Sequence, residues 1–301
     1  MLRDYLKEAL EPTVLFGMLS ACLGIAVASF YVKFHIFTAM LIVIGIALAN
    51  MSVNMLDDYI DYKNGIDSET VKTNFSGGSK FMVDGTLNPT NVLLLGISAF
   101  LVAAIIGIYL SASNIAVIPF VIIGGVSILL YAIYVVRVPF LAEPLVALNY
   151  MLIAVGSFVV ATGSIAHLTT ALFVAFPAGS VIGMALFINE IPDRKVDKRH
   201  DRKTCAALLK SNKDMSYYYI VWQFAAYFAI ILGIIYGIIP FTEILVLAAS
   251  PFMVICFLAI RHYSSPVKFE KYMGINALHA FLVVLLLIFG YIIVNYPPVI
   301  V

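Results

Sequence analysis

Long apolar runs separated by short polar segments make up most of the chain. Charge-free runs of about the 20 residues that cross a bilayer core occur at 12–31, 35–53, 89–110, 115–136, 145–166, 168–188, 216–238, 244–260 and 272–296. The runs are too long and too uniformly apolar for barrel strands, so we expect helices. The pattern predicts about nine transmembrane helices, with eight or ten as alternatives because the eighth run is short and the fifth and sixth are nearly continuous.

Composition strengthens this interpretation. Of the 301 residues, 62% are hydrophobic and 12% are charged, whereas soluble domains carry about 25% charged residues. Lipid must therefore be the solvent for much of the chain. The net charge of +1 argues against nucleic acid as a partner. Cys22, Cys205 and Cys256 form no CxxC pair, so we expect neither a disulfide framework nor a zinc site.

The basic residues predict the orientation. If the N-terminus is cytosolic and the connections alternate, all but one of the 18 lysines and arginines lie inside, and only Lys33 lies outside. Such an asymmetry is typical of the positive-inside rule. The first eleven residues mix both charges and lack the features of a cleaved signal peptide, so the first apolar run is expected to stay as a span. The C-terminal NYPPVIV would lie outside.

Two inside connections are long and begin with acidic residues. They cover about 54–88 and 189–215. The first carries Asn54, Asp57, Asp58, Asp61 and Asp67, and the second carries Asn189, Asp193 and Asp197. Helical spacing places most of these groups on shared faces, and Gly65 is expected to stop the first helix. Like charges so spaced repel each other, and a divalent cation would offset the repulsion.

The two acidic segments stand in the same register. Asn54 and Asn189 are 135 residues apart, and so are Asp58 and Asp193. We infer one domain over 1–301 with a weak internal repeat, about 12–110 and 145–238. Each half would contribute one acidic face to a shared site at the cytosolic end.

Basic groups near the acids indicate a phosphate-containing ligand. They are Lys80, Arg137, Arg202 and Lys203. Gly77 and Gly78 allow backbone N–H groups to approach an anion. Carboxylates suit Mg²⁺, which binds few protein carboxylates together with substrate phosphates. A site that has both acidic and basic groups and opens into an apolar helical bundle suits a molecule with a diphosphate head and a hydrocarbon tail. The alternative is that these charges are solvated loop ends.

These residues resemble the UbiA superfamily of intramembrane prenyltransferases over nearly the whole chain. Family members carry an N-x-x-x-D type first motif and a D-x-x-x-D second motif, which match 54–61 and 193–197. The segments NMLDDYIDYKNGID and SGGSKFMVDGTL look most like the dihydroxynaphthoate-prenylating, menaquinone branch. Two single residues and one segment depart from that branch: Asp57 replaces Asn, Glu11 replaces a basic residue, and Asp201-Arg202-Lys203-Thr204 replaces Gly-Lys-Arg-Thr.

The resemblance implies an all-α membrane protein whose helices surround an apolar cavity capped by cytosolic loops. It also implies Mg²⁺-dependent transfer of a prenyl chain from an isoprenyl diphosphate to an aromatic acceptor such as dihydroxynaphthoate. The implied metal ligands are Asp57, Asp58, Asp61, Asp193 and Asp197. The implied catalytic groups are Asp58, Asp61, Asp67, Asp193 and Asp197, and Asp67 would assist deprotonation of the acceptor.

Substrate contacts would come from polar, basic and aromatic side chains. These are Asn54, Lys80, Tyr131, Tyr134, Arg137, Asn189, Arg202 and Lys203. Tyrosine π faces would stabilise an allylic carbocation. Prenyl transfer to hydroxybenzoate or to a glycerol-phosphate lipid, and terpene cyclisation, remain alternatives within the family. A secondary transporter is the alternative outside it, but transporters carry ionisable residues at the midplane. We expect a prokaryotic plasma membrane as the location.

Overall fold

The computed structural model describes residues 2–33, 35–112 and 114–295, and all regular structure in this part of the chain is helical. The helices are α1 (Leu2–Ala9), α2 (Pro12–Ser29), α3 (Ile36–Lys63), α4 (Ile66–Glu69), α5 (Pro89–Ala112), η1 (Ile115–Val117), α6 (Ile118–Leu130), η2 (Val135–Arg137), α7 (Ala142–Thr162), α8 (Leu168–Glu190), α9 (Arg194–Arg199), α10 (Cys205–Leu208), α11 (Asn212–Ile235), η3 (Phe241–Ala249), α12 (Ser250–Arg261) and α13 (Pro266–Asn295). The predicted all-α class is confirmed.

Within the described residues, eight helical stretches are long and apolar enough to cross a membrane, and Ile115–Leu130 is a shorter apolar helix. The predicted count of about nine includes that shorter helix. The fourth predicted run, 115–136, yields a helix only to Leu130 because the chain turns at 131–134 before η2. The predicted position of the C-terminus concerns 296–301, which lie outside the described residues.

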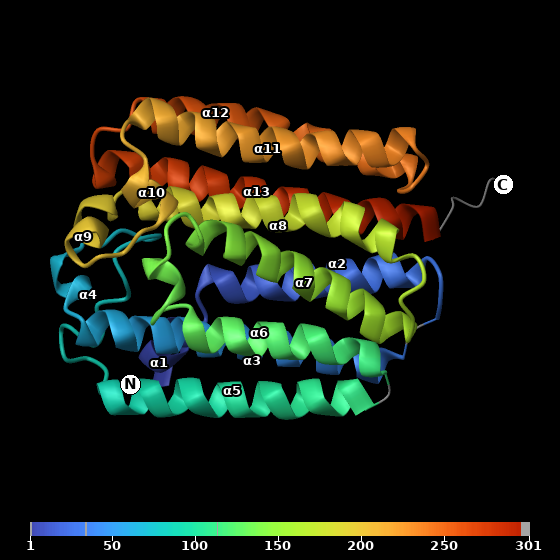
Figure 1. The fold of residues 1–301 in the computed structure, drawn as a ribbon, viewed down its shortest axis with the longest axis horizontal. Coiled ribbons are helices and arrows are strands. Elements are labelled where there is room, and N and C mark those ends of the chain that lie inside the picture. Colours follow the sequence, from blue (N-terminus) through green and yellow to red (C-terminus); the bar gives the residue numbers. More distant parts are fainter. Residues whose placement is uncertain (1, 34, 113, 296–301) are drawn as a thin grey trace.

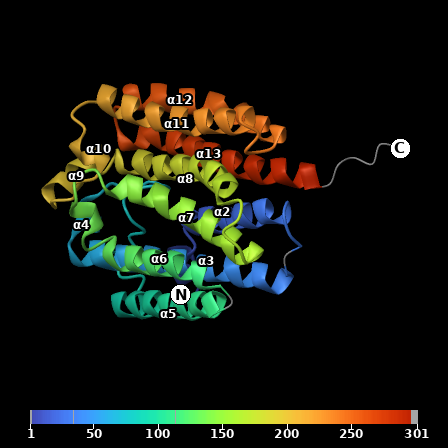
Figure 2. The ribbon, with the colours of Figure 1, turned by 45° about the vertical axis from the view of Figure 1, so that its right-hand side comes forward.

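The long helices lie side by side along one direction, and the short helices α4, α9 and α10 gather at one end (Figures 1 and 2). α2 packs on α3 and α7, α3 on α5, α7 on α8, and α8 on α11 and α13. The order α2–α3–α5 parallels the order α7–α8–α11, which is the arrangement that the predicted repeat would give. The repeat itself stays a prediction.

Small residues bring some of these helices into close contact. A Cβ atom on Gly24 of α2 would lie 2.0 Å from the Ala154 carbonyl oxygen of α7. One on Gly179 of α8 would lie 2.3 Å from the Ala147 carbonyl oxygen. Glycine therefore allows the backbones to approach, as is common between membrane helices.

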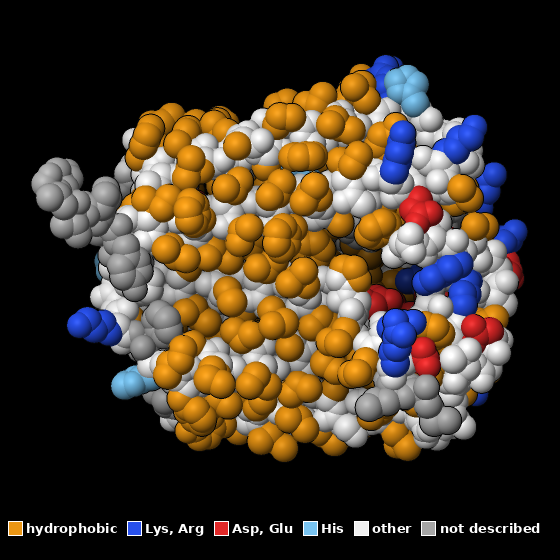
Figure 3. Space-filling view, turned by 180° about the vertical axis from the view of Figure 1, so that it is seen from behind, with side chains coloured by type: hydrophobic (Ala, Val, Ile, Leu, Met, Phe, Trp, Pro, Cys, Tyr) orange, Lys and Arg blue, Asp and Glu red, His pale blue; other side chains and the backbone are white. Residues whose placement is uncertain are grey.

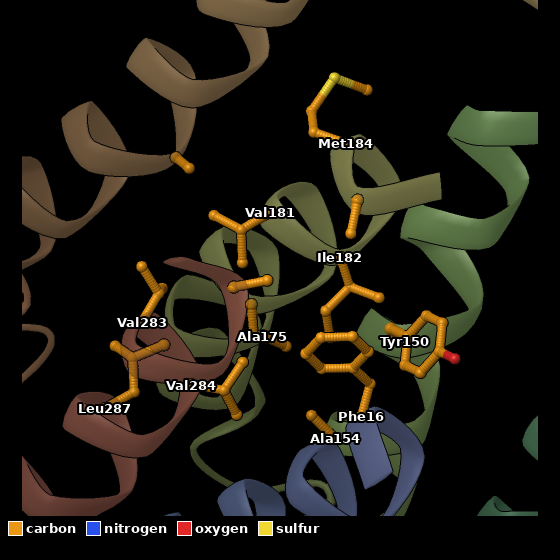
Figure 4. Packing of buried hydrophobic residues seen from close by; sticks show 14 of the residues in the cluster. Phe16, Tyr150, Ala154, Ala175, Val181, Ile182, Met184, Val283, Val284 and Leu287 are labelled. Carbon is orange, nitrogen blue, oxygen red and sulfur yellow. The ribbon is translucent and has the colours of Figure 1, made fainter. Parts of the chain in front are cut away.

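The packed core lies mainly between α2, α7, α8 and α13. The main apolar cluster includes Phe16, Tyr150, Val181 and Leu287 from α2, α7, α8 and α13 (Figure 4). Figure 3 shows a broad apolar surface over the helices, with charged side chains gathered mainly at one end. The surface is hollowed where these two regions meet. This distribution is that of an integral membrane protein with a polar end.

Candidate functional site

A cavity of about 760 Å³ lies within the bundle. Side chains from α3, α5, α6 and α7 form its apolar walls, and the start of α2 and the end of α8 complete it. Its polar residues gather at the end where the acidic segments lie. The cavity therefore has the amphipathic lining predicted for a molecule with a charged head and an apolar tail.

The first acidic segment continues from a membrane helix, as predicted. α3 runs without interruption to Lys63, so Asn54, Asp57, Asp58 and Asp61 form successive turns of one helix and all line the cavity. Gly65 then adopts φ 76°, a left-handed conformation that ends the helix at little cost. Asp67, on the single turn of α4, also lines the cavity.

The second acidic segment differs from a single continuous helix. α8 ends at Glu190, the chain turns through 191–193, and α9 begins at Arg194. Pro192 has no N–H to continue the hydrogen bonding of α8. Asp193 and Asp197 nevertheless share one helical turn, because the Asp197 N–H donates to the Asp193 carbonyl at 3.0 Å. Both residues and Asn189 line the cavity.

Arg202 joins the two acidic segments. Its guanidinium donates a hydrogen bond to Asp61 Oδ2 of α3 and lies 3.7 Å from Asp197 Oδ1 of α9. The Arg202 side chain is only 11% exposed, so the contacts with Asp61 and Asp197 are shielded from solvent. The predicted convergence of segments distant in sequence is thus present in the structure.

The glycine pair connects the intervening loop to both segments. The Gly77 N–H donates to Asp193 Oδ2 at 3.0 Å. Gly78 has φ 66°, and a Cβ there would lie 2.2 Å from Asp67 Oδ1. The anion that the Gly77 N–H contacts is therefore the protein's own carboxylate. Glycine at 78 lets the Asp67 carboxylate sit against the backbone.

Burial perturbs the acids that lie outside the spanning helices. Desolvation raises the pKa of Asp67 and of Asp197 to about 7 and that of Asp193 to about 6. Burial alone would lower the pKa of Arg202, but Asp61 and neighbouring carboxylates raise it well above its usual value. The site concentrates more negative charge than its own cations compensate, which is the condition for binding a metal cation.

The donor set fits Mg²⁺. Asp57 Oδ1 and Asp58 Oδ2 are buried without a hydrogen-bond partner. In the described part of the chain, no three histidine, cysteine or acidic side chains are already gathered as a metal-binding group. Mg²⁺ is commonly held by one or two carboxylates plus substrate phosphates and waters, so a preformed cage is not needed.

Four predicted substrate contacts do not lie on the cavity wall. The ammonium group of Lys80 donates to the Asp67 and Thr70 carbonyls and to the Thr70 hydroxyl, inside the loop. Tyr134 is 61% exposed. Arg137 lines a separate cavity of about 150 Å³ beside Arg202.

The fourth residue is Lys203, whose ammonium lies 3.5 Å from Asp201 Oδ1. Its backbone N–H donates to Val136, which ties this segment to η2. Of the two predicted tyrosines, only Tyr131 lines the cavity. The turn at 131–134 explains the difference, because a short turn directs neighbouring side chains to different sides.

Sequence reasoning missed several polar residues of the cavity. Lys72, Glu11 and Glu190 line it. Lys72 is a cavity-lining cation for which the described residues show no ion pair; its ammonium contacts the Gly78 carbonyl. Burial raises the pKa of Glu11 to about 7. The available clue was Glu11 itself, an acid at the helix start where the resembled branch has a base.

A buried hydrogen-bond network positions Asn54. The Thr13 hydroxyl donates to Asn54 Oδ1 at 2.9 Å, and the Tyr150 hydroxyl lies 3.1 Å from the Thr13 carbonyl and 3.2 Å from Asn50 Oδ1. Asn54 Nδ2 is buried without a partner. The network fixes the Asn54 amide and leaves its donor group free beside the cavity.

Comparison with known proteins agrees with this geometry. The model of the UbiA prenyltransferase family matches residues 17–282. The chain is 25% identical over 253 residues to 1,4-dihydroxy-2-naphthoate octaprenyltransferase of Bacillus subtilis (strain 168), covering 82% of this chain and 75% of that protein.

Two solved structures share the fold. A UbiA homolog from Aeropyrum pernix K1 in the apo state has a TM-score of 0.69 at 16% identity, covering 94% of this chain and 97% of that one. A UbiA homolog from Archaeoglobus fulgidus bound to GPP and Mg²⁺ has a TM-score of 0.57 at 15% identity, covering 94% and 99%. The predicted resemblance and the predicted prenyltransferase class are confirmed. The chain belongs to the UbiA prenyltransferase family.

Proposed function

We propose that this prenyltransferase moves a prenyl chain from an isoprenyl diphosphate to an aromatic acceptor such as dihydroxynaphthoate, inside the membrane and with Mg²⁺. The observation that carries the proposal is the convergence of two acidic segments at the polar end of an otherwise apolar cavity. The Bacillus subtilis relative, a naphthoate octaprenyltransferase, supports the choice of acceptor.

Asp57, Asp58, Asp61, Asp193 and Asp197 would hold the Mg²⁺ ions. Bound Mg²⁺ would neutralise the charge that develops on the departing diphosphate. Arg202 and the Gly77 N–H already fix three of these carboxylates in place. The protein thus limits the reorganisation that ligand binding requires.

The diphosphate also needs cations from the protein. Lys72 faces the cavity, whereas Lys80 is held within the loop, so we assign the main charge-assisted contact to Lys72. Asn54 would donate its free amide N–H to a substrate oxygen. The role of Lys80 would then be to fix the loop that carries Lys72, Gly77 and Gly78.

The remaining steps take place in the apolar part of the site. The walls exclude water from the allylic carbocation, and Tyr131 offers a π face close to the acidic end. Asp67 would accept the acceptor's hydroxyl proton: the O–H bond breaks, and its electron pair stays on the ring oxygen. The C–O bond to diphosphate breaks and its electron pair leaves with the diphosphate, which gives the allylic carbocation. The electron-rich ring carbon then forms the new C–C bond to this carbocation. That carbon finally loses its proton, or its carboxyl group as CO₂, and the ring becomes aromatic again.

The same proposal gives an orientation. Charged side chains gather mainly at the polar end (Figure 3). The alternation of spans predicts this side for all lysines and arginines except Lys33. We place this end in the cytosol of a prokaryotic cell and the opposite end outside. Soluble isoprenyl diphosphates and acceptors with polar groups would then reach the site from the cytosolic side.

The test is turnover by the purified protein in nanodiscs. Geranylgeranyl diphosphate would be combined separately with dihydroxynaphthoate, hydroxybenzoate and geranylgeranylglyceryl phosphate, each with Mg²⁺ or EDTA. We expect a Mg²⁺-dependent prenylated naphthoate product. We expect Asp193→Asn to reduce turnover at least about 100-fold while the protein still inserts and purifies.

Each other result has a defined meaning. Preference for another acceptor would reject dihydroxynaphthoate and keep the transferase chemistry. Diphosphate release without an adduct would indicate cyclisation. Undiminished turnover in EDTA, or near-normal activity of Asp193→Asn, would contradict the metal site.

A further inference from the structure

The helix pair α11 and α12 exposes two neighbouring apolar stripes at the edge of the bundle. The two helices pack against each other, run in opposite directions and lie side by side (Figures 1 and 2). The stripe of α11 consists of Tyr217, Val221, Phe224 and Phe228, which are 47–64% exposed, and that of α12 consists of Val254 and Leu258, 47% and 48% exposed. Spacings of three and four residues place each set on one face of its helix. In a membrane protein such a face contacts lipid.

Two cations meet at one end of these stripes. Lys213 Nζ lies 5.9 Å from the centre of the Tyr217 ring, and Arg261 Cζ lies 5.8 Å from the same centre. Arg261 is the last residue of α12, and Lys213 lies in the first turn of α11. Asn212 Nδ2 donates to the Tyr263 carbonyl at 2.9 Å, which fixes these two helix ends to each other. One exposed ring therefore holds two positive groups, one from each helix.

Within the residues that the structure describes, no acidic side chain forms an ion pair with Lys213 or Arg261. Both side chains are exposed. The nearest acid in the sequence is Asp214, and its carboxylate accepts a hydrogen bond from the Ser211 hydroxyl at 2.8 Å. Two cations held close together without an acidic partner create a positive potential that attracts an anion.

We propose that Lys213 and Arg261 bind the phosphate of an anionic phospholipid whose hydrocarbon chains lie along the apolar stripes of α11 and α12. The two cations stand where the charge-free runs of their helices end, which is the level of lipid phosphates at a membrane surface. Tyr217 connects the two parts of the site, because tyrosine favours the membrane–water interface. Free phosphate would use the cations but not the stripes, so the continuity of the two favours a lipid.

Trp222 gives a local readout of lipid contact because it is the single tryptophan of the chain. It follows Val221 on α11 and is partly exposed. The purified protein would be placed in vesicles of phosphatidylcholine and phosphatidylglycerol, with one of the two lipids carrying brominated chains. Quenching of Trp222 fluorescence then reports which lipid occupies the adjacent surface. Each cation near a membrane surface contributes about a fivefold gain in affinity, so we expect phosphatidylglycerol to be preferred by up to about 25-fold.

The variants remove the charges and leave the stripes in place. Lys213→Gln and Arg261→Gln should each reduce the preference about fivefold, and the double variant should bind the two lipids about equally. The matched control is the double variant Lys195→Gln, Lys198→Gln, which removes two charges from exposed positions of α9 at the same end of the molecule. We expect the control to keep the preference. Raising the salt concentration should weaken the preference in the wild type.

Equal quenching by the two brominated lipids in the wild type would overturn the proposal. A preference that survives in the Lys213→Gln, Arg261→Gln variant would also overturn it. Loss of the preference in the α9 control would do the same, because net charge would then explain it. If inorganic phosphate at constant ionic strength abolishes the preference, the cations bind free phosphate and the lipid assignment is wrong. Prenyl transfer is measured separately, so the lipid site and the proposed reaction can each fail alone.

Discussion

Replacing Arg202 with glutamine should reveal how the two acidic segments are held together. Arg202 contacts Asp61 of α3 and Asp197 of α9, and the three side chains are 11%, 14% and 5% exposed. Removing one partner of a buried ion pair leaves an uncompensated charge and typically costs about 3–5 kcal/mol. At a few degrees per kcal/mol, the apparent melting temperature should fall on the order of 10 °C.

The size of the loss should depend on pH. Without the guanidinium, Asp197 can lower the electrostatic cost by binding a proton. The pKa of Asp197 is already about 7 because of burial, and it would rise further in the variant. The destabilisation should therefore be small at pH 6 and large at pH 8.5.

The assay is thermal unfolding in detergent, at both pH values, with Mg²⁺ and with EDTA. Mg²⁺ should recover part of the loss because it supplies positive charge to the same carboxylates. Arg199→Gln is the matched control: Arg199 pairs with Glu69 at 2.7 Å, but these side chains are 61% and 43% exposed. We expect no measurable shift for the control. Equal melting temperatures for Arg202→Gln and wild type at pH 8.5 would refute the reasoning.

Three further changes test other parts of the site. Lys72→Met should raise the KM for the diphosphate donor about 10- to 100-fold through loss of a charge-assisted hydrogen bond. Lys80→Met should mainly lower the melting temperature. A KM that rises in Lys80→Met and stays unchanged in Lys72→Met would contradict our assignment. Gly78→Ala should destabilise the loop by at least about 1 kcal/mol, because φ is 66° and the new Cβ would meet Asp67 Oδ1 at 2.2 Å; wild-type turnover and melting temperature would show that the loop relaxes freely. Burial raises the pKa of Asp67, Asp193 and Asp197 to about 6–7, above their unfolded value near 4, so the metal-free protein should lose stability as pH rises from about 4 to 7. Stabilisation by Mg²⁺ should therefore grow between pH 5 and pH 8, and an equal Mg²⁺ effect at both would refute this.

The positions of the acidic residues could be predicted from the sequence because they depend on the local helix. Gly65 ends α3 where a left-handed residue is needed, and helical continuity places Asp57 and Asp61 beside the cavity. The convergence of the two acidic segments was inferred from the matching register of Asn54 with Asn189 and of Asp58 with Asp193. Spacing sufficed because a helix fixes the direction of each side chain.

The basic half was predicted less well because loop conformation decides it. Lys72 and Lys80 lie in the same connection, and nothing in their local sequence says which one reaches the cavity. Lys80 adopts φ 68°, a rare left-handed conformation for a non-glycine residue, and its ammonium bonds within the loop. A turn at the end of α6 likewise explains why Tyr131 lines the cavity and Tyr134 does not.

The internal contacts of the acidic segments bear on how the site binds its ligands. Asp193 receives the Gly77 N–H, and Asp61 and Asp197 share Arg202, whereas Asp57 Oδ1 and Asp58 Oδ2 have no partner. Carboxylates with partners are held at a fixed position, and those without partners carry the unmet demand for a cation. Since buried unpaired charge is costly, Mg²⁺ and diphosphate binding should relieve the free energy stored at Asp57 and Asp58. We expect the paired carboxylates Asp61, Asp193 and Asp197 to meet the ligand with little rearrangement, because their positions are already fixed.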